Sequence, residues 1–432
     1  MREMKSSGVA WIGNIPKAWG LIRYKDKYKN SKEIAGDKSR SYERLALTLN
    51  GVIKRPKDDS DGLQPKEFDT YQVLHENDFV FKMIDLQNIS TSRVGLSPYT
   101  GLVSPAYIRF CPKNKKQYPR FIYYFLMSMY YNCVFNNLGG DGVRSALNSS
   151  DMGMLLIPYP IEIEQHRIAD YLDTACSKVN SLIVNQQTQI EKLKQYKQSL
   201  ITEVVTKGLN PNVSMKDSGV KWIGQIPEEW NLTSVRYIGS LQNGISKSGE
   251  AFGTGYPFVC YGDIYKNYEL PTMVAGLVET NEKEREQYSV EYGDVFFTRT
   301  SETIEEVGFS CVCKQTISNA TFAGFVIRMR PYKADEKILT NFAKYYFRGS
   351  QIRAYLVKEM NLVTRASLGQ TLLKGMSVTI PPKEEQQQIA TYLDDKCAKI
   401  DRLIAIKQEK IDKLNDYKKS LIYEYVTGKK EV

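Results

Sequence analysis

Histidine is scarce in this sequence, which argues against a zinc site. Only His75 and His166 occur among 432 residues, and no His-x-x-x-His or Cys-x-x-Cys spacing is present. Cys311 and Cys313 alternate along an expected strand, where they are better explained as core residues than as metal ligands. The seven cysteines are odd in number and scattered, so they predict no disulfide framework and favour a reducing cytoplasm.

Long apolar runs are also missing. The most apolar segment, FIYYFLMSMYYNCVF at 121–135, is interrupted by Ser128 and Asn132 and is shorter than the ~20 residues that cross a bilayer. The sequence does not open with a signal peptide pattern. We therefore expect a buried helix at 121–135 and no membrane association.

Signatures of catalysis are absent as well. The string FGTG at 252–255 lacks the spacing of a P-loop or a dinucleotide fingerprint and is typical of a turn. DNA amino-methyltransferases carry Asp or Asn before Pro-Pro-aromatic, whereas the nearest strings, IPYP at 157–160 and IPPKE at 380–384, have Ile there. The acidic string EKERE at 282–286 is typical of a solvated face. These absences favour a chain without catalysis of its own.

Charge, in contrast, is present with an excess of one sign. Lys and Arg number 59 against 49 Asp and Glu, a formal net charge of +10. A basic balance makes polyanions such as nucleic acid natural partners. With 42% hydrophobic and 25% charged residues the chain is globular, and its length suffices for two or three domains.

The four tryptophans lie in two short stretches that repeat each other. Residues 4–20 and 215–231 are identical at 11 of 17 positions, and residues 165–206 match 386–427 at 22 of 42. The offsets of 211 and 221 residues far exceed the roughly 20–50 residues of a solenoid repeat. The chain is therefore a duplication of one whole domain.

Between these anchors lie two divergent middles, 21–160 and 232–381. Each mixes short β-type runs with turn residues and closes with an aromatic helical stretch, which predicts a compact mixed domain. NDFVFK in the first middle resembles GDVFFT in the second, and GVRSAL resembles LVTRASL. The scaffold is retained while the rest has diverged.

The repeats at 165–206 and 386–427 are predicted to be long amphipathic helices. Apolar residues follow steps of three and four, as in a coiled-coil seam, although the pattern is imperfect near Gln186 and Lys407. Without internal Pro or Gly, each helix could run for about 40 residues, or ~60 Å. The predicted seam comprises Ile168, Leu172, Ala175, Val179, Leu182, Leu193, Tyr196 and Leu200, then Ile389, Leu393, Ile400, Leu403, Leu414, Tyr417 and Leu421.

Each long helix needs a partner, and the other copy is the obvious one. The first helix runs from the first middle towards the second, and the second helix can only return, so the pair is expected to be antiparallel. Separate docking of each helix on its own domain is the alternative. The predicted fold class is α+β, with two mixed α/β domains joined by two long antiparallel helices, a coiled-coil spacer, in a pseudo-twofold internal duplication.

Several strings together resemble a known family. They are the two SGVxWIGxIPxxW openings, the helix starts EQHRIADYLD (164–173) and EQQQIATYLD (385–394), and VSPAY at 103–107. In their joint order they resemble the specificity subunit of type I restriction-modification systems over essentially the whole chain.

The resemblance implies a non-catalytic subunit in which each middle is a target recognition domain for one half of a bipartite double-stranded DNA sequence. It implies that the helices set the spacer and dock two methylation subunits, with restriction subunits in complexes that cut DNA. S-adenosylmethionine, ATP and Mg2+ would be used by those partners, and this chain would hold no cofactor or metal. The expected order is 1–20 tryptophan motif, 21–160 first recognition domain, 161–207 first helix, 208–231 linker and second motif, 232–381 second recognition domain, 382–428 second helix and 429–432 tail.

Candidate DNA contacts follow from side-chain chemistry, because Lys and Arg suit phosphates and bidentate Arg also reads bases. Arg144 and Arg365 match at an offset of 221, which favours a shared phosphate or scaffold role. An ordinary salt bridge is the alternative explanation for every candidate. The candidates are Lys54, Arg55, Lys82, Arg93, Arg144, Lys247, Arg299 and Arg365.

Two other classes of function stay open at this point. A free-standing architectural protein that bridges DNA would bind tightly without sequence preference, and an enzyme with an unrecognised site would show activity in the isolated chain. The repeated tryptophans, Trp11, Trp19, Trp222 and Trp230, are predicted to pack the corners where each domain meets the end of the opposite helix.

Overall fold

The computed structural model describes residues 2–49, 51–59, 67–84, 86, 93–114, 116–138, 146–301, 306–359, 361–362 and 366–432. The chain forms two compact units, which are described separately. Unit 1 comprises Met1–Gln187 with Glu409–Val432, and unit 2 comprises Thr188–Gln408. Each unit therefore combines one variable middle with a segment of each long helix.

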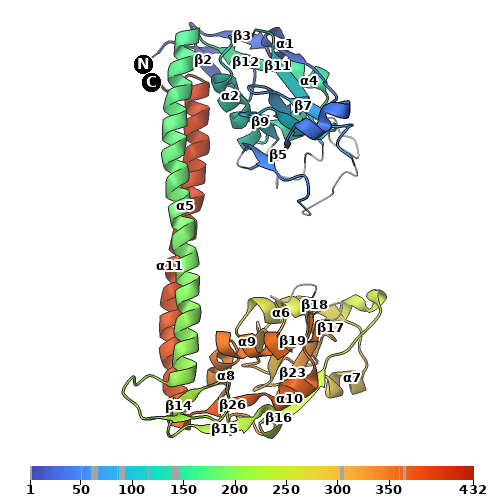
Figure 1. Ribbon diagram of the computed structural model, residues 1–432, viewed down its shortest axis with the longest axis vertical. Helices are drawn as coiled ribbons and strands as arrows, with labels where there is room; N and C mark the ends of the chain where they lie inside the picture. Colours follow the sequence, from blue (N-terminus) through green and yellow to red (C-terminus); the bar gives the residue numbers. More distant parts are fainter. Residues whose placement is uncertain are drawn as a thin grey trace. The chain divides into compact units, whose positions relative to one another are not determined.

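Both long helices are present. α5 (Glu162–Lys207) has 46 residues and α11 (Lys383–Val426) has 44, labelled in Figure 1. Their first residues lie one position after the starts expected at 161 and 382. Both helices contain segments of each unit.

The helix segments are antiparallel within each unit. In unit 1, Lys418 donates a hydrogen bond to Asn180 over 2.9 Å, and the rings of Tyr171 and Tyr425 lie 4.5 Å apart. Residue numbers rise along one helix as they fall along the other, which fixes the direction. Unit 2 repeats the pattern with the hydrogen-bonded pairs Lys197–Asp401 and Lys407–Gln189.

The buried line along α5 differs from the predicted seam near its middle. Burial passes from Val179 through Ile183, Gln186 and Ile190, in regular steps of four and three. Leu182 is 46% exposed and lies outside the seam. The spacing of buried residues stays regular because a polar residue, Gln186, occupies a buried seam position. From the sequence pattern alone, this glutamine is expected to interrupt the seam.

The same shift occurs in α11. Leu403 is 48% exposed, whereas Ile404 and Lys407 are half-buried and Ile411 is buried. Tyr196 and Tyr417 are exposed as well. Of the other predicted seam residues, Ile168, Leu172, Val179, Ile389, Leu393, Ile400 and Leu421 are buried, and Ala175, Leu193, Leu200 and Leu414 are half-buried.

Unit 1 contains two four-stranded sheets, with strand orders β6-β5-β10-β7 and β4-β11-β8-β9. Its elements are β1 (Met4–Ser6), β2 (Asn14–Pro16), β3 (Gly20–Arg23), α1 (Tyr24–Lys27), β4 (Tyr28–Asn30), β5 (Arg44–Thr48), β6 (Gly51–Arg55), β7 (Gln72–Leu74), β8 (Phe79–Phe81), β9 (Val94–Leu96), β10 (Gly101–Val103), β11 (Ile108–Pro112), α2 (Arg120–Tyr131), α3 (Val134–Leu138), α4 (Ser149–Met154) and β12 (Leu156–Tyr159).

Unit 2 contains sheets of orders β16-β23-β19-β21, β18-β17-β22 and β20-β25-β24. Its elements are β13 (Met215–Asp217), β14 (Gln225–Pro227), β15 (Asn231–Ser234), β16 (Gly239–Asn243), β17 (Phe252–Val259), α6 (Tyr261–Lys266), β18 (Gly276–Val278), α7 (Glu282–Gln287), β19 (Val295–Thr298), β20 (Thr300–Ser301), β21 (Ser310–Val312), β22 (Thr321–Phe322), β23 (Val326–Pro331), α8 (Thr340–Tyr346), α9 (Ser350–Glu359), β24 (Asn361–Leu362), β25 (Ala366–Ser367), α10 (Gln370–Gly375) and β26 (Ser377–Ile380).

One four-stranded antiparallel sheet is common to the two divergent middles. The order β4-β11-β8-β9 of unit 1 corresponds to β16-β23-β19-β21 of unit 2. The strings NDFVFK and GDVFFT form the equivalent strands β8 and β19, as their similarity predicts. The duplication therefore extends into the middles, where little identity remains.

Each middle is closed at its base by one pair of strands. β3, which enters the first middle, pairs antiparallel with β12, which leaves it, and Gly20 faces Tyr159. β15 and β26 do the same in unit 2, with Asn231 facing Ile380. The two ends of each inserted domain thus lie side by side on a shared two-stranded stem.

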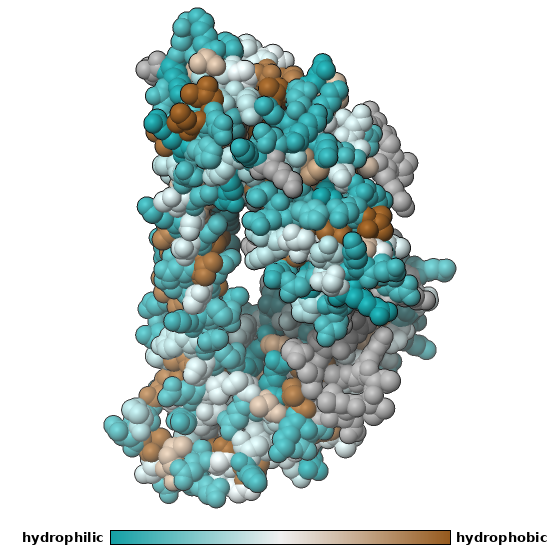
Figure 2. Space-filling view, turned by 45° about the horizontal axis from the view of Figure 1, so that its top comes forward, coloured by the Kyte–Doolittle hydropathy of each residue, from teal (hydrophilic) through white to brown (hydrophobic). Residues whose placement is uncertain are grey.

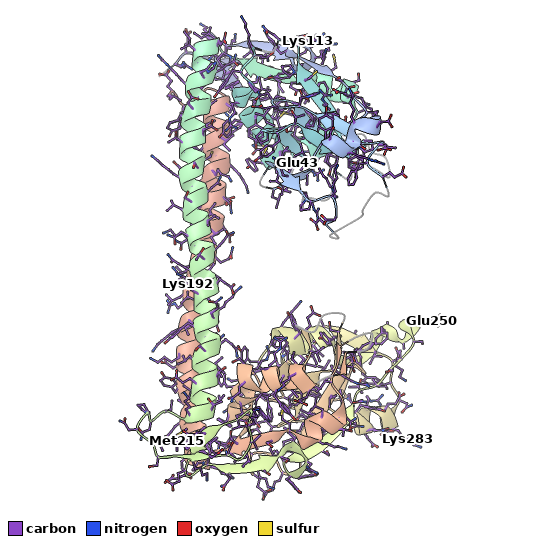
Figure 3. All side chains as sticks on the ribbon, viewed as in Figure 1. Glu43, Lys113, Lys192, Met215, Glu250 and Lys283 are labelled. Carbon is purple, nitrogen blue, oxygen red and sulfur yellow. The ribbon has the colours of Figure 1, made fainter. Side chains whose placement is uncertain are left out.

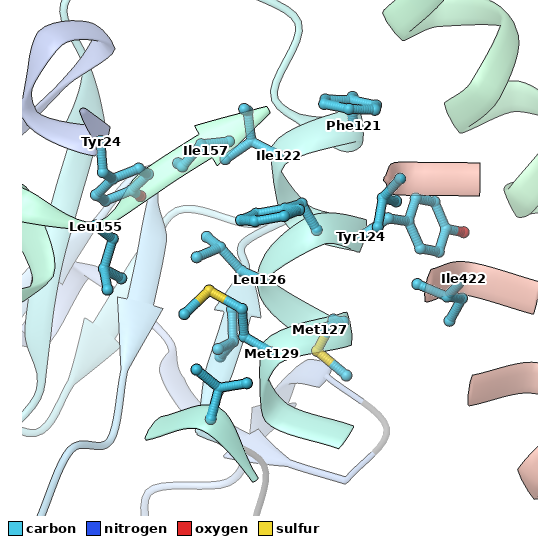
Figure 4. Packing of buried hydrophobic residues seen from close by; sticks show 14 of the residues in the cluster. Tyr24, Phe121, Ile122, Tyr124, Leu126, Met127, Met129, Leu155, Ile157 and Ile422 are labelled. Carbon is cyan, nitrogen blue, oxygen red and sulfur yellow. The ribbon is translucent and has the colours of Figure 1, made fainter. Parts of the chain in front are cut away.

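The aromatic helix α2 packs between the sheet and the helix pair of unit 1. Phe121, Ile122 and Leu126 are buried, in agreement with the buried helix predicted at 121–135. Figure 4 shows Leu126 among side chains of the domain, and Tyr124 facing Ile422 of α11. One continuous core therefore joins the domain of unit 1 to its long helices.

A buried ion pair recurs beside the common sheet. The Asp78 carboxylate accepts a hydrogen bond from Arg109 Nε over 2.6 Å, and Asp294 accepts two from Arg330. Burial raises the pKa of both carboxyls above the ordinary range for aspartate, against the lowering effect of the arginines. Removing either arginine would leave a buried carboxylate without its partner, so these pairs belong to the scaffold.

No helix in the part of the chain that the structure describes is both long and apolar enough to cross a membrane. Hydrophilic side chains cover most of the face in Figure 2, and apolar ones appear in small groups.

The corrected seam can be tested with two neighbouring residues of α5. Ile183→Ala should lower the free energy of unfolding by about 2–4 kcal/mol, because it leaves a cavity in the seam. Leu182→Ala, the matched control one residue away, should change it by less than about 0.5 kcal/mol. Denaturant unfolding of the full chain measures both, and equal losses would contradict the assignment.

Candidate nucleic-acid interface

Lys54 and Arg55 lie on the β5–β6 hairpin of unit 1, where both side chains are at the surface. Lys54 Nζ lies 2.6 Å from a carboxylate oxygen of Glu43, which is labelled in Figure 3, and this contact raises the lysine pKa. Arg55 Nε lies 2.5 Å from Asp59. Surface ion pairs are worth little free energy, so either cation can exchange its carboxylate for a phosphate.

Arg93 is a correction to the predicted set. Its side chain is 2% exposed, and it donates a hydrogen bond to the Leu86 carbonyl over 2.6 Å. A side chain held inside the core cannot reach DNA in this structure, so the scaffold alternative applies. Lys82 is half-buried, and its backbone N–H donates to the Arg93 carbonyl.

Arg144 and Arg365 lie outside the described residues, but the leucines that follow them in the matching strings do not. The Leu147 N–H donates to the Met83 carbonyl over 3.1 Å, and the Leu368 N–H donates to the Arg299 carbonyl over 2.8 Å. The two strings therefore make the same backbone contact, in each case with a residue that lies shortly after strand β8 or β19.

Lys247 and Arg299 belong to unit 2. Lys247 Nζ contacts Glu284 over 2.5 Å and is partly exposed. The half-buried Arg299 donates from its guanidinium to the Gly324 carbonyl over 3.3 Å. Within the described part of the chain each side chain has one such contact, and lysine and arginine carry several donors, which suits contacts with phosphates or base edges.

Each middle is joined to the helices by a tryptophan. In unit 1 the buried Trp19 donates from its indole N–H to Glu164, in the first turn of α5, over 3.0 Å. Its ring also shares a core with Leu421 and Ile422 of α11. The predicted corner between domain and opposite helix end is therefore present.

Unit 2 repeats this joint. Trp230 is buried and donates to Glu385, in the first turn of α11, over 2.8 Å. A Cβ built at Gly208, just past the end of α5, would lie 3.5 Å from its ring. The corresponding Cβ at Gly428, after α11, would lie 3.0 Å from Trp19.

The glycine at each helix end is required by its conformation. Gly208 has a φ of +78° and Gly428 a φ of +70°, the left-handed geometry that commonly ends helices. A Cβ at Gly428 would also lie 2.4 Å from Pro16, and one at Gly208 would lie 2.5 Å from Glu385. At Gly428 the rings of Pro16 and Trp19 thus leave no room for a side chain, and at Gly208 a side chain would have to displace the Glu385 carboxylate.

The motif EQxxIAxYLD contains joint residues that the sequence reasoning quoted but assigned no role. Its Gln165 and Gln386 are buried and donate to the carbonyls of Pro160 and Pro381. Its last residue ties the helix to the aromatic helix of the domain, since Asp173 accepts from Tyr124 and Asp394 from Tyr345. Identity at an offset of 221 was the signal that could have identified them.

Cys176 is buried beside this joint, and burial raises its pKa to about 11, so it is held as a thiol. Among the described residues, no three His, Cys, Asp or Glu side chains are grouped to hold a metal ion.

Comparison with known proteins decides what kind of scaffold this is. The sequence matches the family model for the type I restriction modification DNA specificity domain at residues 27–192 and again at 227–416. The chain belongs to this family. Each match covers most of one recognition domain and continues into the long helix that follows it.

Individual specificity subunits are distant relatives. The type I restriction enzyme StySPI specificity subunit of Salmonella potsdam is 22% identical, over 72% of this chain and 65% of its own length. The MjaVIII specificity subunit of Methanocaldococcus jannaschii is 22% identical, over 96% of this chain and 93% of its own. This chain thus spans about two thirds of the first relative and nearly all of the second.

A solved structure has the same fold. It comes from work on complex assembly and conformational transition of the type I R-M system, and it aligns with a TM-score of 0.66 at 15% identity. The alignment covers 95% of this chain and 98% of that one. The family match in sequence is therefore accompanied by a match in fold.

The tryptophan joint of this specificity-family chain predicts a measurable interaction energy. Trp230→Phe should cost about 2–3 kcal/mol of unfolding free energy, because a hydrogen bond to a charged group is lost and the ring becomes smaller. Trp222→Phe is the control, since the Trp222 ring is half-buried and stacks on Tyr355 at 4.5 Å. It should cost less than about 1.5 kcal/mol.

A double-mutant cycle of Trp230→Phe with Glu385→Ala, followed by denaturant unfolding, isolates the pair. A coupling energy near zero would show that the indole N–H contributes nothing to the joint.

Proposed function

We propose that this chain is the non-catalytic DNA-reading subunit of a type I restriction-modification complex. Each unit reads one half of a bipartite double-stranded DNA target, and the two long helices set the spacing between the halves. The observation that carries the proposal is a scaffold repeated in two units around divergent surfaces. A DNA target with two different halves suits such an arrangement. Each domain can change the side chains that contact DNA while its attachment to the helices stays the same.

The charge and chemistry of the exposed residues support DNA as the ligand. The chain carries a net charge of +10, and Lys54, Arg55, Lys247 and Arg299 are side chains of the types that donate to phosphates and base edges. A contribution of phosphate contacts makes affinity fall steeply with salt. A free-standing architectural protein would share that salt dependence but would not distinguish one sequence from another.

The outer faces of the helix pair support two copies of one partner. Unit 1 exposes Leu182 and Tyr417, and unit 2 exposes Leu403 and Tyr196. These residues correspond at an offset of 221, so the same apolar pair occurs once in each unit. Large apolar side chains on a helix face favour protein contact. We infer that one methylation subunit docks on each pair.

The chemistry then belongs to the partners. They would use S-adenosylmethionine for adenine methylation and, where restriction subunits are also bound, ATP and Mg2+ for cleavage. A restriction-modification complex acts on DNA in the cytoplasm, which agrees with a chain whose seven cysteines include four buried ones that form no disulfides.

The assignment of reading to the middles is tested by exchanging residues 21–160 for the corresponding domain of another family member. Co-expressed with its methylation subunit, the parent chain should direct adenine methylation to one bipartite motif, and the exchange should alter one half-site only. Methylation mapping by long-read sequencing gives both motifs. Unmodified DNA with the parent chain would contradict the proposed function and favour an architectural role.

Docking of two partners is tested by charge substitutions on one outer face. Leu182→Glu with Tyr417→Glu should leave one methylation subunit bound, because burial of an unpaired carboxylate at an interface is costly. Lys192→Glu, at an exposed polar position of α5, is the control and should retain both. Mass measurement of the purified complex separates the outcomes, and two bound subunits in the double variant would exclude this face.

A further inference from the structure

A large apolar side chain stands exposed on a turn of unit 2. Phe325 is 59% exposed and lies between β22 and β23. Single exposed apolar residues are common on proteins, so exposure alone carries no function. The surroundings of this residue, however, are built in a specific way.

The turn is fixed from two sides. The Arg299 N–H donates to the Phe325 carbonyl over 2.9 Å, and the Arg299 guanidinium donates to the carbonyl of Gly324. On the other side the turn approaches Ser246 so closely that a Cβ at Gly324 would lie 2.3 Å from its hydroxyl. Phe325 is therefore presented on a preorganised backbone.

Half-buried polar side chains lie on the segments next to this turn, since Gly244 bonds to Val326 and Leu368 to Arg299. Gln370 donates to Asn243 over 2.9 Å, and the hydroxyls of Thr300 and Ser367 lie 3.2 Å apart. Asn243 ends β16, which pairs with β23, so this group and Phe325 share one region of the domain. Amides, hydroxyls and a guanidinium are the groups that read base edges.

The equivalent positions of unit 1 have a different chemistry. In the common sheet, Ile108 faces Phe81 as Ile327 faces Phe297. Two residues before each isoleucine, Ala106 therefore corresponds to Phe325. By the same register Met83 corresponds to Arg299, and each accepts the equivalent leucine N–H described above.

The strand register and the leucine contact are thus shared, while an Arg–Phe pair in unit 2 replaces a buried Met and an Ala in unit 1. A scaffold role would be expected to retain the residue types in both copies. Divergence of residue type on an equivalent strand register is instead what distinguishes two readers of different sequences.

We propose that Phe325 is a base-contacting specificity residue for the half-site that unit 2 reads, with Arg299 as the residue that positions it. This inference rests on the proposed function of the chain. An apolar ring can discriminate a base by packing against a thymine methyl group or by entering a base step. Either contact requires an exposed ring on a rigid backbone, as the turn provides.

Phe325→Ala tests the proposal in the complete complex with its methylation subunits. Methylation rates are measured on duplexes that carry each single-base change in the half-site of unit 2, which exchange of residues 232–381 identifies. The preference for the correct base should fall about tenfold at one position and stay unchanged at the others. The half-site of unit 1 and the spacer should not change.

Tyr332→Ala is the matched control, because Tyr332 is 69% exposed and follows the opposite end of β23, roughly 20 Å away along the strand. It should leave every preference unchanged. Thermal unfolding of both variants verifies folding, and Phe325→Leu provides a second variant that keeps an apolar group.

Unchanged discrimination at every position in Phe325→Ala and Phe325→Leu would overturn the assignment while leaving the proposed function intact. Loss of base preference at positions of both half-sites together would also overturn it, since a base contact sets the preference only where it touches the DNA. A parent complex without sequence-specific methylation would instead refute the proposed function, and the assignment of Phe325 with it.

Discussion

The structure depends on the hydrogen bond between a buried tryptophan and the first-turn glutamate of a long helix. Trp19 with Glu164, and Trp230 with Glu385, fix the start of each helix against its domain. Each indole also reaches the glycine that ends the opposite helix, so one side chain holds three chain segments. A carboxylate at a helix N-terminus is favoured by the helix dipole, and the indole N–H satisfies it where water is excluded. The divergent domains can vary because this joint does not.

Further residues of the EQxxIAxYLD motif also hold the start of each long helix against its domain. A buried glutamine bonds to the backbone that enters the helix, and an aspartate two turns later accepts from a tyrosine of the domain. Burial and these hydrogen bonds raise the pKa of Tyr124 and Tyr345 well above the ordinary range for tyrosine. Both phenols therefore stay protonated and remain donors. Two equivalent polar networks thus hold two domains that share little sequence.

Periodicity and repetition could predict the duplication, the mixed domains, the long helices and the tryptophan corners, because those features leave local or repeated patterns. They could not place the middle of the seam, since Gln186 is buried in a position where polarity suggested an interruption. Arg93 was indistinguishable from a surface cation, because its burial depends on contacts formed by the fold. Phe325 was missed for a related reason. Its significance depends on a register shared with Ala106, in a region where the two copies can no longer be aligned by identity.

The composition of the units has a consequence for synthesis. Unit 2 is one continuous segment, whereas unit 1 requires residues 409–432, whose Leu421, Ile422 and Val426 complete its core. A ribosome delivers the chain from its N-terminus, and closing a long loop is slow and entropically costly. Of the two units, unit 1 is therefore begun first and completed second, and until residues 409–432 follow, its core lacks the apolar side chains that α11 contributes.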